Sequence, residues 1–300
     1  MIISFIICTY NREKYIYECL SRLASNTVKE GWEIILVNNN STDNTAAECE
    51  RFVEDYQPAN YHYCLETQQG LSFARNRGIQ EAKGEWLVFL DDDAMVEPEY
   101  IASLQKHLSD HPEAGAFGGQ IIPLFEDGEP EWYSKWTMIY VSAMDRGKTV
   151  HPFPANKYPI GANMGVKREV IDRVGMFNTA LGRTGNNLLS GEEKDLFNRI
   201  HAAGYPILYF PDIQVHHCIP AHRTTKEFIA RLADGVGQSE RLRTRHIGAA
   251  AYCKRLIMEC VKWGGTIVLW AFYALQGKFS KGNILVLFRH HVTKALLSRS

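Results

Sequence analysis

An apolar run that ends in three consecutive carboxylates restricts the fold of this chain more than any other feature. Residues 86–90 are all apolar, and Asp91, Asp92 and Asp93 follow directly. A short apolar run bounded by polar residues predicts a buried strand. Three adjacent like charges repel one another, and a divalent cation such as Mg²⁺ or Mn²⁺, which binds carboxylate oxygens, would offset that repulsion. The run therefore predicts a metal site at a strand end, with a solvated acidic turn as the alternative.

Strand and helix signals alternate through the first part of the chain. Hydrophobic pattern and capping residues predict strands at 2–8, 32–37, 61–66 and 86–90, and helices at 13–25, 45–56 and 73–82. Such alternation is typical of an α/β fold with a mostly parallel sheet flanked by helices. Ligands of these sheets bind at the carboxyl ends of the strands. We therefore expect the polar residues after Cys8, Val37 and Leu90 to share one pocket.

The C-terminal region differs from the rest in charge and hydropathy. Residues 226–300 hold 13 Lys or Arg against 4 Asp or Glu, although the whole chain has a net charge of −1. A basic tail predicts an anionic partner, either a membrane surface or a nucleic acid. The uncharged stretch 263–275 is shorter than the ~20 residues of a spanning helix. We therefore expect amphipathic helices lying in the plane of an anionic membrane, with a core helix or a homo-oligomer interface as the alternative.

The cysteines and the N-terminus point to the cytoplasm. The seven cysteines form no C-x-x-C pair, which favours reduced thiols over a disulfide framework. The apolar start at residues 2–7 lacks a basic region before it, so we interpret it as a first strand and not as a signal peptide. Together with the tail, this predicts a cytoplasmic protein that is peripheral or monotopic on the cytoplasmic face of the membrane.

Six short motifs, in their order and spacing, resemble glycosyltransferase family 2, the inverting nucleotide-sugar transferases of the GT-A fold. They are Cys8–Arg12, Val37–Thr45, Gly70–Asn76, Leu90–Asp93, Gly161–Gly165 and Gly191–Leu196. The resemblance implies a Rossmann-like GT-A catalytic domain at 1–225, with a nucleotide-sugar-binding part at 1–119 and an acceptor-binding part at 120–225. The basic amphipathic helical extension at 226–300 lies outside it.

The resemblance also implies which residues contact the nucleotide sugar. Asn39 stands where the family usually has an Asp that accepts a hydrogen bond from uracil N3–H, and its amide can accept as well as donate. Arg75 suits phosphate or base contacts, with a surface helix arginine as the alternative. The turn after the first strand would meet the base, although Asn11 there is also a candidate helix N-cap. That turn consists of Thr9, Tyr10, Asn11 and Arg12.

The metal ligands come from the carboxylate triplet and a histidine pair. The resemblance implies that Asp93 binds the metal and that Asp91 lies toward the ribose or the metal's water shell, while Asp92, also assigned to the nucleotide sugar, points the other way. One histidine of the pair His216 and His217 would complete the metal shell, because strand alternation turns only one of them inward. We favour His216. A surface pair is the alternative.

The general base is expected at the start of a late helix. The resemblance implies that Glu193 deprotonates the acceptor hydroxyl, and that Gly161, Asn163 and Glu192 lie in the acceptor and donor-sugar region. The alternative for the two glutamates is helix capping, because Ser190 and Glu193 have the spacing of a capping box and acids suit a helix N-terminus.

We therefore expect a hexosyltransferase-type enzyme of class EC 2.4 that uses Mn²⁺ or Mg²⁺. It would transfer the sugar of a nucleotide diphosphate donor, expected to be a UDP-sugar, to a hydroxyl of a saccharide or lipid-linked acceptor. The expected setting is polysaccharide or glycan biosynthesis. A nucleotidyltransferase is an alternative, but its Gly-rich basic loop is absent from residues 9–12. A non-enzymatic binder that uses the basic tail is another, but the acidic body argues against nucleic acid as a partner.

Overall fold

The computed structural model describes residues 2–155, 157–184 and 191–298, and these form two compact units. The α/β unit comprises the described residues of 2–124, 142–184 and 191–218. The helical unit comprises 125–141 and 219–298. The division falls a few residues before the boundary that we expected at 225, and it assigns part of the expected acceptor region, 125–141, to the helical unit.

One half of the sheet in the α/β unit is parallel and follows the predicted alternation. The strands are β1 (Ile3–Thr9), β2 (Trp32–Asn38), β3 (Tyr61–Leu65) and β4 (Trp86–Asp91), and they pair in the order β3-β2-β1-β4. The intervening helices are α1 (Ile16–Ala24), α2 (Thr45–Tyr56) and α3 (Leu71–Glu81). The predicted α/β fold is confirmed by these alternating strands and helices. Because the strands are parallel, their carboxyl ends meet at one edge of the sheet.

The other half of the sheet is antiparallel, an arrangement that the alternation of strands and helices does not predict. From β4 the order continues β8-β6-β9-β5, and β7 pairs with β9. The strands are β5 (Ala94–Val96), β6 (Ala116–Phe125), β7 (His151–Pro152), β8 (Asn163–Lys167) and β9 (Ile207–Ile219). The helices are α4 (Tyr100–Asp110), α5 (Arg168–Val174) and α6 (Glu192–Ala202). The sheet is therefore mixed, and β5 brings the end of the carboxylate triplet against β9.

Continuous apolar strands explain the parallel half. Phe5, Ile7 and Val88 are fully buried, as expected for parallel strands that are covered by helices on both faces. Gly78 of α3 lies so close to β1 that a Cβ atom there would overlap the Ile6 side chain. The missing side chain lets α3 pack directly on the sheet, which places the residues of its first turns near the carboxyl ends of the strands.

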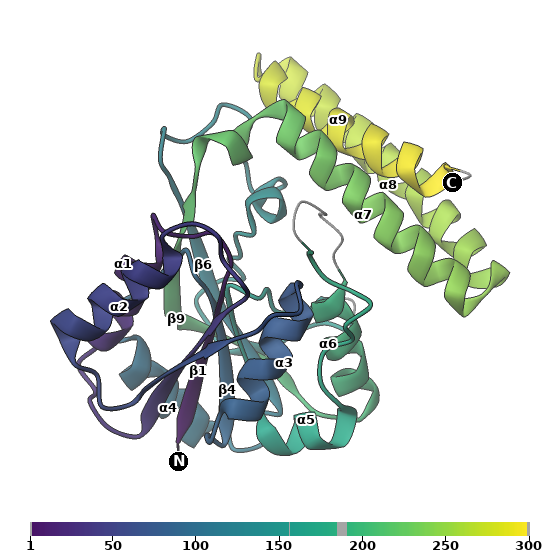
Figure 1. The fold of residues 1–300 in the computed structure, drawn as a ribbon. Coiled ribbons are helices and arrows are strands. Elements are labelled where there is room, and N and C mark those ends of the chain that lie inside the picture. Colours follow the sequence, from purple (N-terminus) through teal and green to yellow (C-terminus); the bar gives the residue numbers. More distant parts are fainter. Residues whose placement is uncertain (1, 156, 185–190, 299–300) are drawn as a thin grey trace. The chain divides into compact units, whose positions relative to one another are not determined.

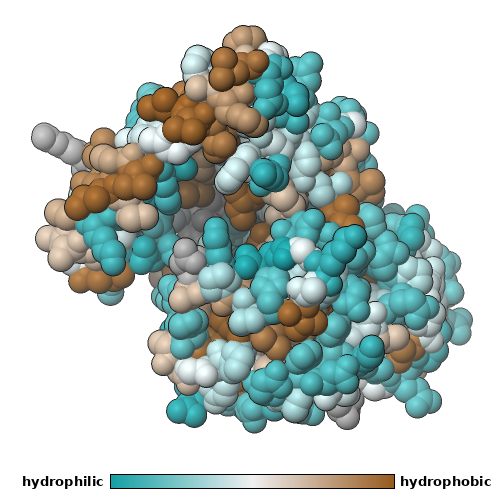
Figure 2. All heavy atoms as spheres, turned by 180° about the vertical axis from the view of Figure 1, so that it is seen from behind, coloured by the Kyte–Doolittle hydropathy of each residue, from teal (hydrophilic) through white to brown (hydrophobic). Residues whose placement is uncertain are grey.

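The helical unit is built from three long helices that pack side by side (Figure 1). They are α7 (Lys226–Ile247), α8 (Ala249–Leu275) and α9 (Phe279–Leu297). The short 3₁₀ turn η2 (Ala221–Thr224) directly precedes α7, and the 3₁₀ turn η1 (Met138–Val141) belongs to the same unit. Gly237 and Gly282 allow close approach, since a Cβ atom would lie 2.5 Å from the Val292 carbonyl and 2.9 Å from the Trp270 ring respectively. The predicted helical C-terminal extension is present. Hydrophobic side chains gather on its surface (Figure 2).

Candidate active site

The turn after β4 holds Asp93 against a histidine of β9. β5 pairs antiparallel with β9, so that Ala94 lies opposite His217, and the Cys218 N–H donates to the Asp93 carbonyl at 2.9 Å. In this register Asp93 Oδ1 lies 2.9 Å from His217 Nε2, and their side chains are 3% and 1% exposed. The pair is therefore fixed by backbone pairing and shielded from bulk water.

Asp91, Asp93 and His217 form a group that fits a divalent cation. One ligand atom from each lies within 4.8 Å of the other two. Two carboxylates and an imidazole suit Mn²⁺, and the carboxylates also suit Mg²⁺. His216 instead pairs with Glu97, at 2.6 Å, on the other face of β9. Our choice of His216 as the inward-facing histidine was therefore wrong, because the register between β5 and β9 turns His217 toward Asp93.

The middle carboxylate of the triplet has a different partner. Asp92 Oδ1 lies 3.1 Å from Arg12 Nε, and the same guanidinium lies 3.8 Å from Asp93 Oδ2. The two carboxylates raise the pKa of Arg12 above its ordinary value, although burial opposes the shift. Arg12 therefore ties the loop after β1 to the carboxylate turn, and a contact of Arg12 or Asp92 with the nucleotide stays a prediction.

The expected base-binding turn is tied to the loop after β2. Asn11 has a left-handed backbone, with φ of 54°, and its Oδ1 accepts from the Thr42 N–H at 2.8 Å. It does not cap α1, which begins at Ile16, so the N-cap interpretation was wrong. Thr9 is buried, whereas Tyr10 is 38% exposed. The Tyr10 ring therefore offers a face on which a flat heterocycle can stack.

Asn39 is committed to the backbone of the next loop. Its Nδ2 donates to the carbonyls of Glu66 and Gln68, at 2.9 and 2.8 Å, and its Oδ1 accepts from the Gly70 N–H at 2.8 Å. Only 5% of the residue is exposed. Both amide hydrogens are used, so one lone pair of Oδ1 is what this side chain has left for a ligand. Asn39 therefore holds the turn that leads into α3, and its contact with a base stays a prediction.

Arg75 is buried at the centre of the site and is not a surface arginine. Its residue exposure is 2%, and its guanidinium lies 3.2 Å from Glu192 Oε1, 3.1 Å from Glu193 Oε1 and 3.9 Å from Asp91 Oδ1. Burial alone would lower the pKa of Arg75, but these three carboxylates raise it above the ordinary value. Arg75 therefore links the end of β4 to the first turn of α6.

Glu193 is held in place by a glycine backbone. The Gly161 N–H donates to Glu193 Oε1 at 3.0 Å, and a Cβ atom on Gly161 would overlap both that oxygen and Arg75 Nη2. Burial raises the pKa of Glu193 to about 7, with Arg75 opposing the shift and Glu192 adding to it. α6 begins at Glu192 after Gly191, and Ser190 of the expected capping box lies outside the described residues.

Asn163 lies inside the sheet, and its place in the acceptor and donor-sugar region stays a prediction. It is completely buried, its Oδ1 accepts from the Tyr100 hydroxyl at 2.6 Å, and its Nδ2 donates to the carbonyls of Gln120 and Ile213 at 3.0 and 2.8 Å. These bonds join β8 to β6, β9 and α4. The structure therefore gives Asn163 a role in holding the antiparallel half of the sheet together.

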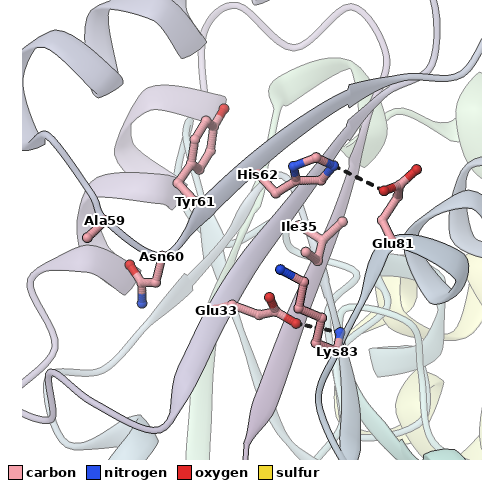
Figure 3. A pocket seen from close by; sticks show the side chains of 8 residues that line it. All are labelled: Glu33, Ile35, Ala59, Asn60, Tyr61, His62, Glu81 and Lys83. Atoms are coloured by element: carbon pink, nitrogen blue, oxygen red, sulfur yellow. Dashed lines mark hydrogen bonds and ion pairs between the residues drawn. The ribbon is translucent and has the colours of Figure 1, made fainter.

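A separate cavity of about 370 Å³ lies at the amino ends of β2 and β3 (Figure 3). Its polar groups pair with one another, since His62 Nε2 lies 3.2 Å from Glu81 Oε2 and the Lys83 N–H donates to Glu33 Oε1 at 2.6 Å (Figure 3). Asp91 and Asp93 of the candidate site lie instead at and just after the carboxyl end of β4. This cavity is therefore distinct from the candidate active site.

Comparison with known proteins agrees with this arrangement. The model of glycosyl transferase family 2 matches residues 4–175. The glucosyl-dolichyl phosphate glucuronosyltransferase of Haloferax volcanii is 27% identical over an alignment of 250 residues that covers 81% of this chain and 77% of that protein. The match thus extends over sheet and helices well beyond the individual motifs.

Two solved structures show the same fold. The mannosyltransferase PcManGT of Pyrobaculum calidifontis, in complex with GDP-Man and Mn²⁺, has a TM-score of 0.65 at 18% identity, over 99% of this chain and 88% of that one. S. aureus TarS 1–349 in complex with UDP-GlcNAc has a TM-score of 0.56 at 19% identity, over 79% of this chain and 66% of that one. At these identities the likeness concerns the fold alone.

The role of Gly161 predicts a loss of stability when a methyl group is added. Gly161→Ala should lower the free energy of unfolding by about 1–3 kcal/mol, because Arg75 and Glu193 must move to admit the new Cβ. Calorimetric unfolding measures this change. The control is Gly264→Ala in α8, where a Cβ atom meets nothing within 4 Å, and it should unfold no earlier than the unmodified protein. Equal stability of both variants would contradict the close packing at Gly161.

The bonds of Asn39 predict that an aspartate does not fit there. Asn39→Asp removes both donors and leaves the Glu66 and Gln68 carbonyls facing a carboxylate, which should cost about 1–3 kcal/mol of stability. The neighbouring exposed residue supplies the control, since Asn40→Asp adds the same charge without removing these bonds. Thermal unfolding at neutral pH compares them, and identical midpoints would show that the amide does not hold the turn.

Proposed function

Because the chain belongs to glycosyltransferase family 2, we propose that it is a metal-dependent, inverting glycosyltransferase that uses a nucleotide diphosphate sugar. Family membership selects the glycosyltransferase over the nucleotidyltransferase and the nucleic-acid binder. One observation carries the proposal for the site. The buried guanidinium of Arg75 joins the candidate metal ligand Asp91 to the candidate base Glu193. Arg75 thus contacts both the proposed site of the departing diphosphate and the proposed general base.

Asp91, Asp93 and His217 would hold the metal. When bound, Mn²⁺ or Mg²⁺ stabilises the negative charge that develops on the departing nucleoside diphosphate. Backbone pairing between β5 and β9 sets the distance between Asp93 and His217, so the ligands need little rearrangement. This preorganisation supports Asp93 and His217 as ligands, with His217 replacing our earlier choice of His216.

Glu193 would accept the proton of the acceptor hydroxyl. Both of its described hydrogen bonds, from Gly161 and Arg75, fall on Oε1, so we assign the proton transfer to Oε2. Because its pKa is raised to about 7, the ionised Glu193 carboxylate is a stronger base than an ordinary glutamate and can accept a proton near neutral pH. The hydroxyl oxygen then attacks the anomeric carbon in line with the departing diphosphate, which inverts the configuration. Buried Glu192 would position the donor sugar or the acceptor together with Gly161.

The donor is proposed to be a UDP-sugar. The exposed Tyr10 ring would stack on the base, with Thr9, Asn11 and Arg12 around it, and the remaining Oδ1 lone pair of Asn39 would accept from uracil N3–H. The two similar structures contain GDP-Man and UDP-GlcNAc, so the fold accommodates both bases. Release of UDP from a panel of UDP-sugars in the presence of Mn²⁺, with GDP-sugars as the comparison, tests this proposal.

The acceptor is proposed to be a saccharide or a lipid-linked saccharide at the cytoplasmic face of the membrane. The name of the Haloferax relative specifies a lipid phosphate, glucosyl-dolichyl phosphate. The excess of basic residues after 225 supports a setting near anionic lipid. The proposed role is therefore in polysaccharide or glycan biosynthesis.

The histidine pair provides a matched test of the metal site. His217→Gln should abolish the Mn²⁺-dependent thermal stabilisation by UDP, because it removes a ligand that only the folded, metal-bound site uses. His216→Gln should keep it, because His216 faces Glu97. Asp93→Ala should behave as His217→Gln and also abolish transfer. Loss of the effect in His216→Gln alone would show that the opposite face of β9 binds the metal.

The base assignment predicts a kinetic effect without a binding effect. Glu193→Gln should lower kcat by about 10²–10⁴-fold and keep donor affinity, since the amide retains the bonds on one oxygen but accepts no proton. In the unmodified protein kcat should rise with pH through about 7 and then level off, because the base acts only when ionised.

The neighbouring glutamate serves as the control for this experiment. Glu192→Gln should retain the rise of kcat with pH, whereas Glu193→Gln should lose it. An active Glu193→Gln together with an inactive Glu192→Gln would place the base one residue earlier.

A further inference from the structure

The helical unit carries charged side chains inside. Arg255 and Glu259 of α8 are 9% and 2% exposed and form an ion pair of 2.6 Å. Glu259 also lies 2.9 Å from Arg289 of α9, and Arg255 lies 3.1 Å from Glu240 of α7. The three helices are therefore joined through one buried ionic network. This network fixes which face of α8 points inward.

The opposite face of α8 is apolar and exposed. Ile257, Val261, Val268, Phe272 and Leu275 are 66%, 63%, 68%, 52% and 90% exposed. Their spacing of three, four and seven residues places them in one stripe along the helix. Figure 2 shows hydrophobic side chains gathered over the helical unit. A continuous exposed apolar surface of this kind marks an interaction site with a protein or a membrane.

Length and charge favour a bilayer surface over a span. By length and composition alone, α8 is long and apolar enough to cross a membrane. However, the uncharged part of α8, from Trp263 to Leu275, covers only about 20 Å of helix, and Lys262 and Lys278 flank it. This is shorter than the ~30 Å hydrocarbon core. The exposed lysines at both ends would meet lipid headgroups if the helix lay in the plane of the interface.

Charge also favours lipid over a second copy of the chain. Residues 226–300 hold 13 basic and 4 acidic side chains. The charged residues of α8 outside the buried network are Lys254 and Lys262, so a symmetric dimer through α8 would bring like charges together, whereas an anionic bilayer attracts them. Trp263 and Trp270 donate to Thr293 and Asn283 of α9 through their ring N–H groups, at 2.9 and 3.0 Å. Their polar atoms are thus satisfied while α8 presents its apolar stripe.

We propose that the outward face of α8 is a monotopic membrane-binding surface. The stripe from Ile257 to Leu275 inserts among the acyl chains of an anionic bilayer, and Lys254, Lys262 and Lys278 contact the headgroups. This inference extends the membrane setting of the proposed function. The biological role of the surface rests on that function, but the binding of α8 to lipid does not. It needs no chemistry in the α/β unit.

Flotation of the full chain with lipid vesicles tests the proposal. The chain should float with vesicles of phosphatidylcholine and phosphatidylglycerol in equal amounts, less with phosphatidylcholine alone, and less at high salt. In the double variant Ile257→Glu with Val268→Glu, the fraction of protein that floats with the vesicles should fall at least about tenfold, because two charges would enter the apolar layer. The control is Ile139→Glu on η1, where Ile139 is 60% exposed but lies outside α8, and it should float as the unmodified chain does.

A second pair of substitutions keeps the test valid if the double variant does not fold. Lys254→Glu with Lys278→Glu changes exposed charges only, and should reduce flotation with the anionic vesicles severalfold. Circular dichroism verifies helix content in every variant. Binding that is unaffected by both pairs of substitutions would overturn the proposal, and so would a full chain that stays unbound to both vesicle types at low salt.

Chromatographic size and UDP release separate the remaining outcomes. A dimer that Ile257→Glu with Val268→Glu dissociates, without flotation of the unmodified chain, would assign the face to self-association and overturn the membrane surface. A chain that floats but releases no UDP from any donor would contradict the proposed function and still support this inference. A chain that releases UDP and never floats would support the proposed function and overturn this inference.

Discussion

The buried guanidinium of Arg75 is the interaction on which the rest of the site depends. Three carboxylates from β4 and α6 approach one cation, and none of these acids has another described cation at comparable distance. Removal of one member of a buried charge group leaves an uncompensated charge, which is strongly destabilising. The close packing of α3 on β1 through Gly78 delivers Arg75 to this position. The sheet, the helix and the acids are therefore coupled through a single side chain.

The aspartate triplet shows how three adjacent like charges coexist. Asp92 is paired with Arg12, Asp93 lies against His217, and Asp91 faces Arg75 at 3.9 Å with 35% of its side chain exposed. Each carboxylate has a different nearest partner, because the chain turns between β4 and β5. The resemblance implied that Asp92 points away from Asp93 and that a histidine lies near Asp93, but the pairing of Asp92 with Arg12 and of Asp91 with Arg75 was not predicted.

The sequence predicts the parts of this protein that local pattern controls. Continuous apolar runs predicted β1, β2 and β4, and α2 begins and ends where its pattern does. β5 and β7 were missed because they are too short to have a pattern of their own. His216 was preferred over His217 because parity along β9 depends on its pairing with β5, which is a tertiary contact. Motif order located Arg75, Asp91 and Glu193, but only the structure shows that they meet.

The amide of Asn39 makes one loop dependent on another. Its three hydrogen bonds reach the backbone of residues 66–70, so the identity of the side chain at position 39 and the shape of that turn are not independent. An aspartate at this position is compatible only with a turn that presents N–H groups where this one presents carbonyls. Across related chains, the residue at this position and the length and conformation of the segment before α3 should therefore covary, and a change of base preference would require both segments to change together.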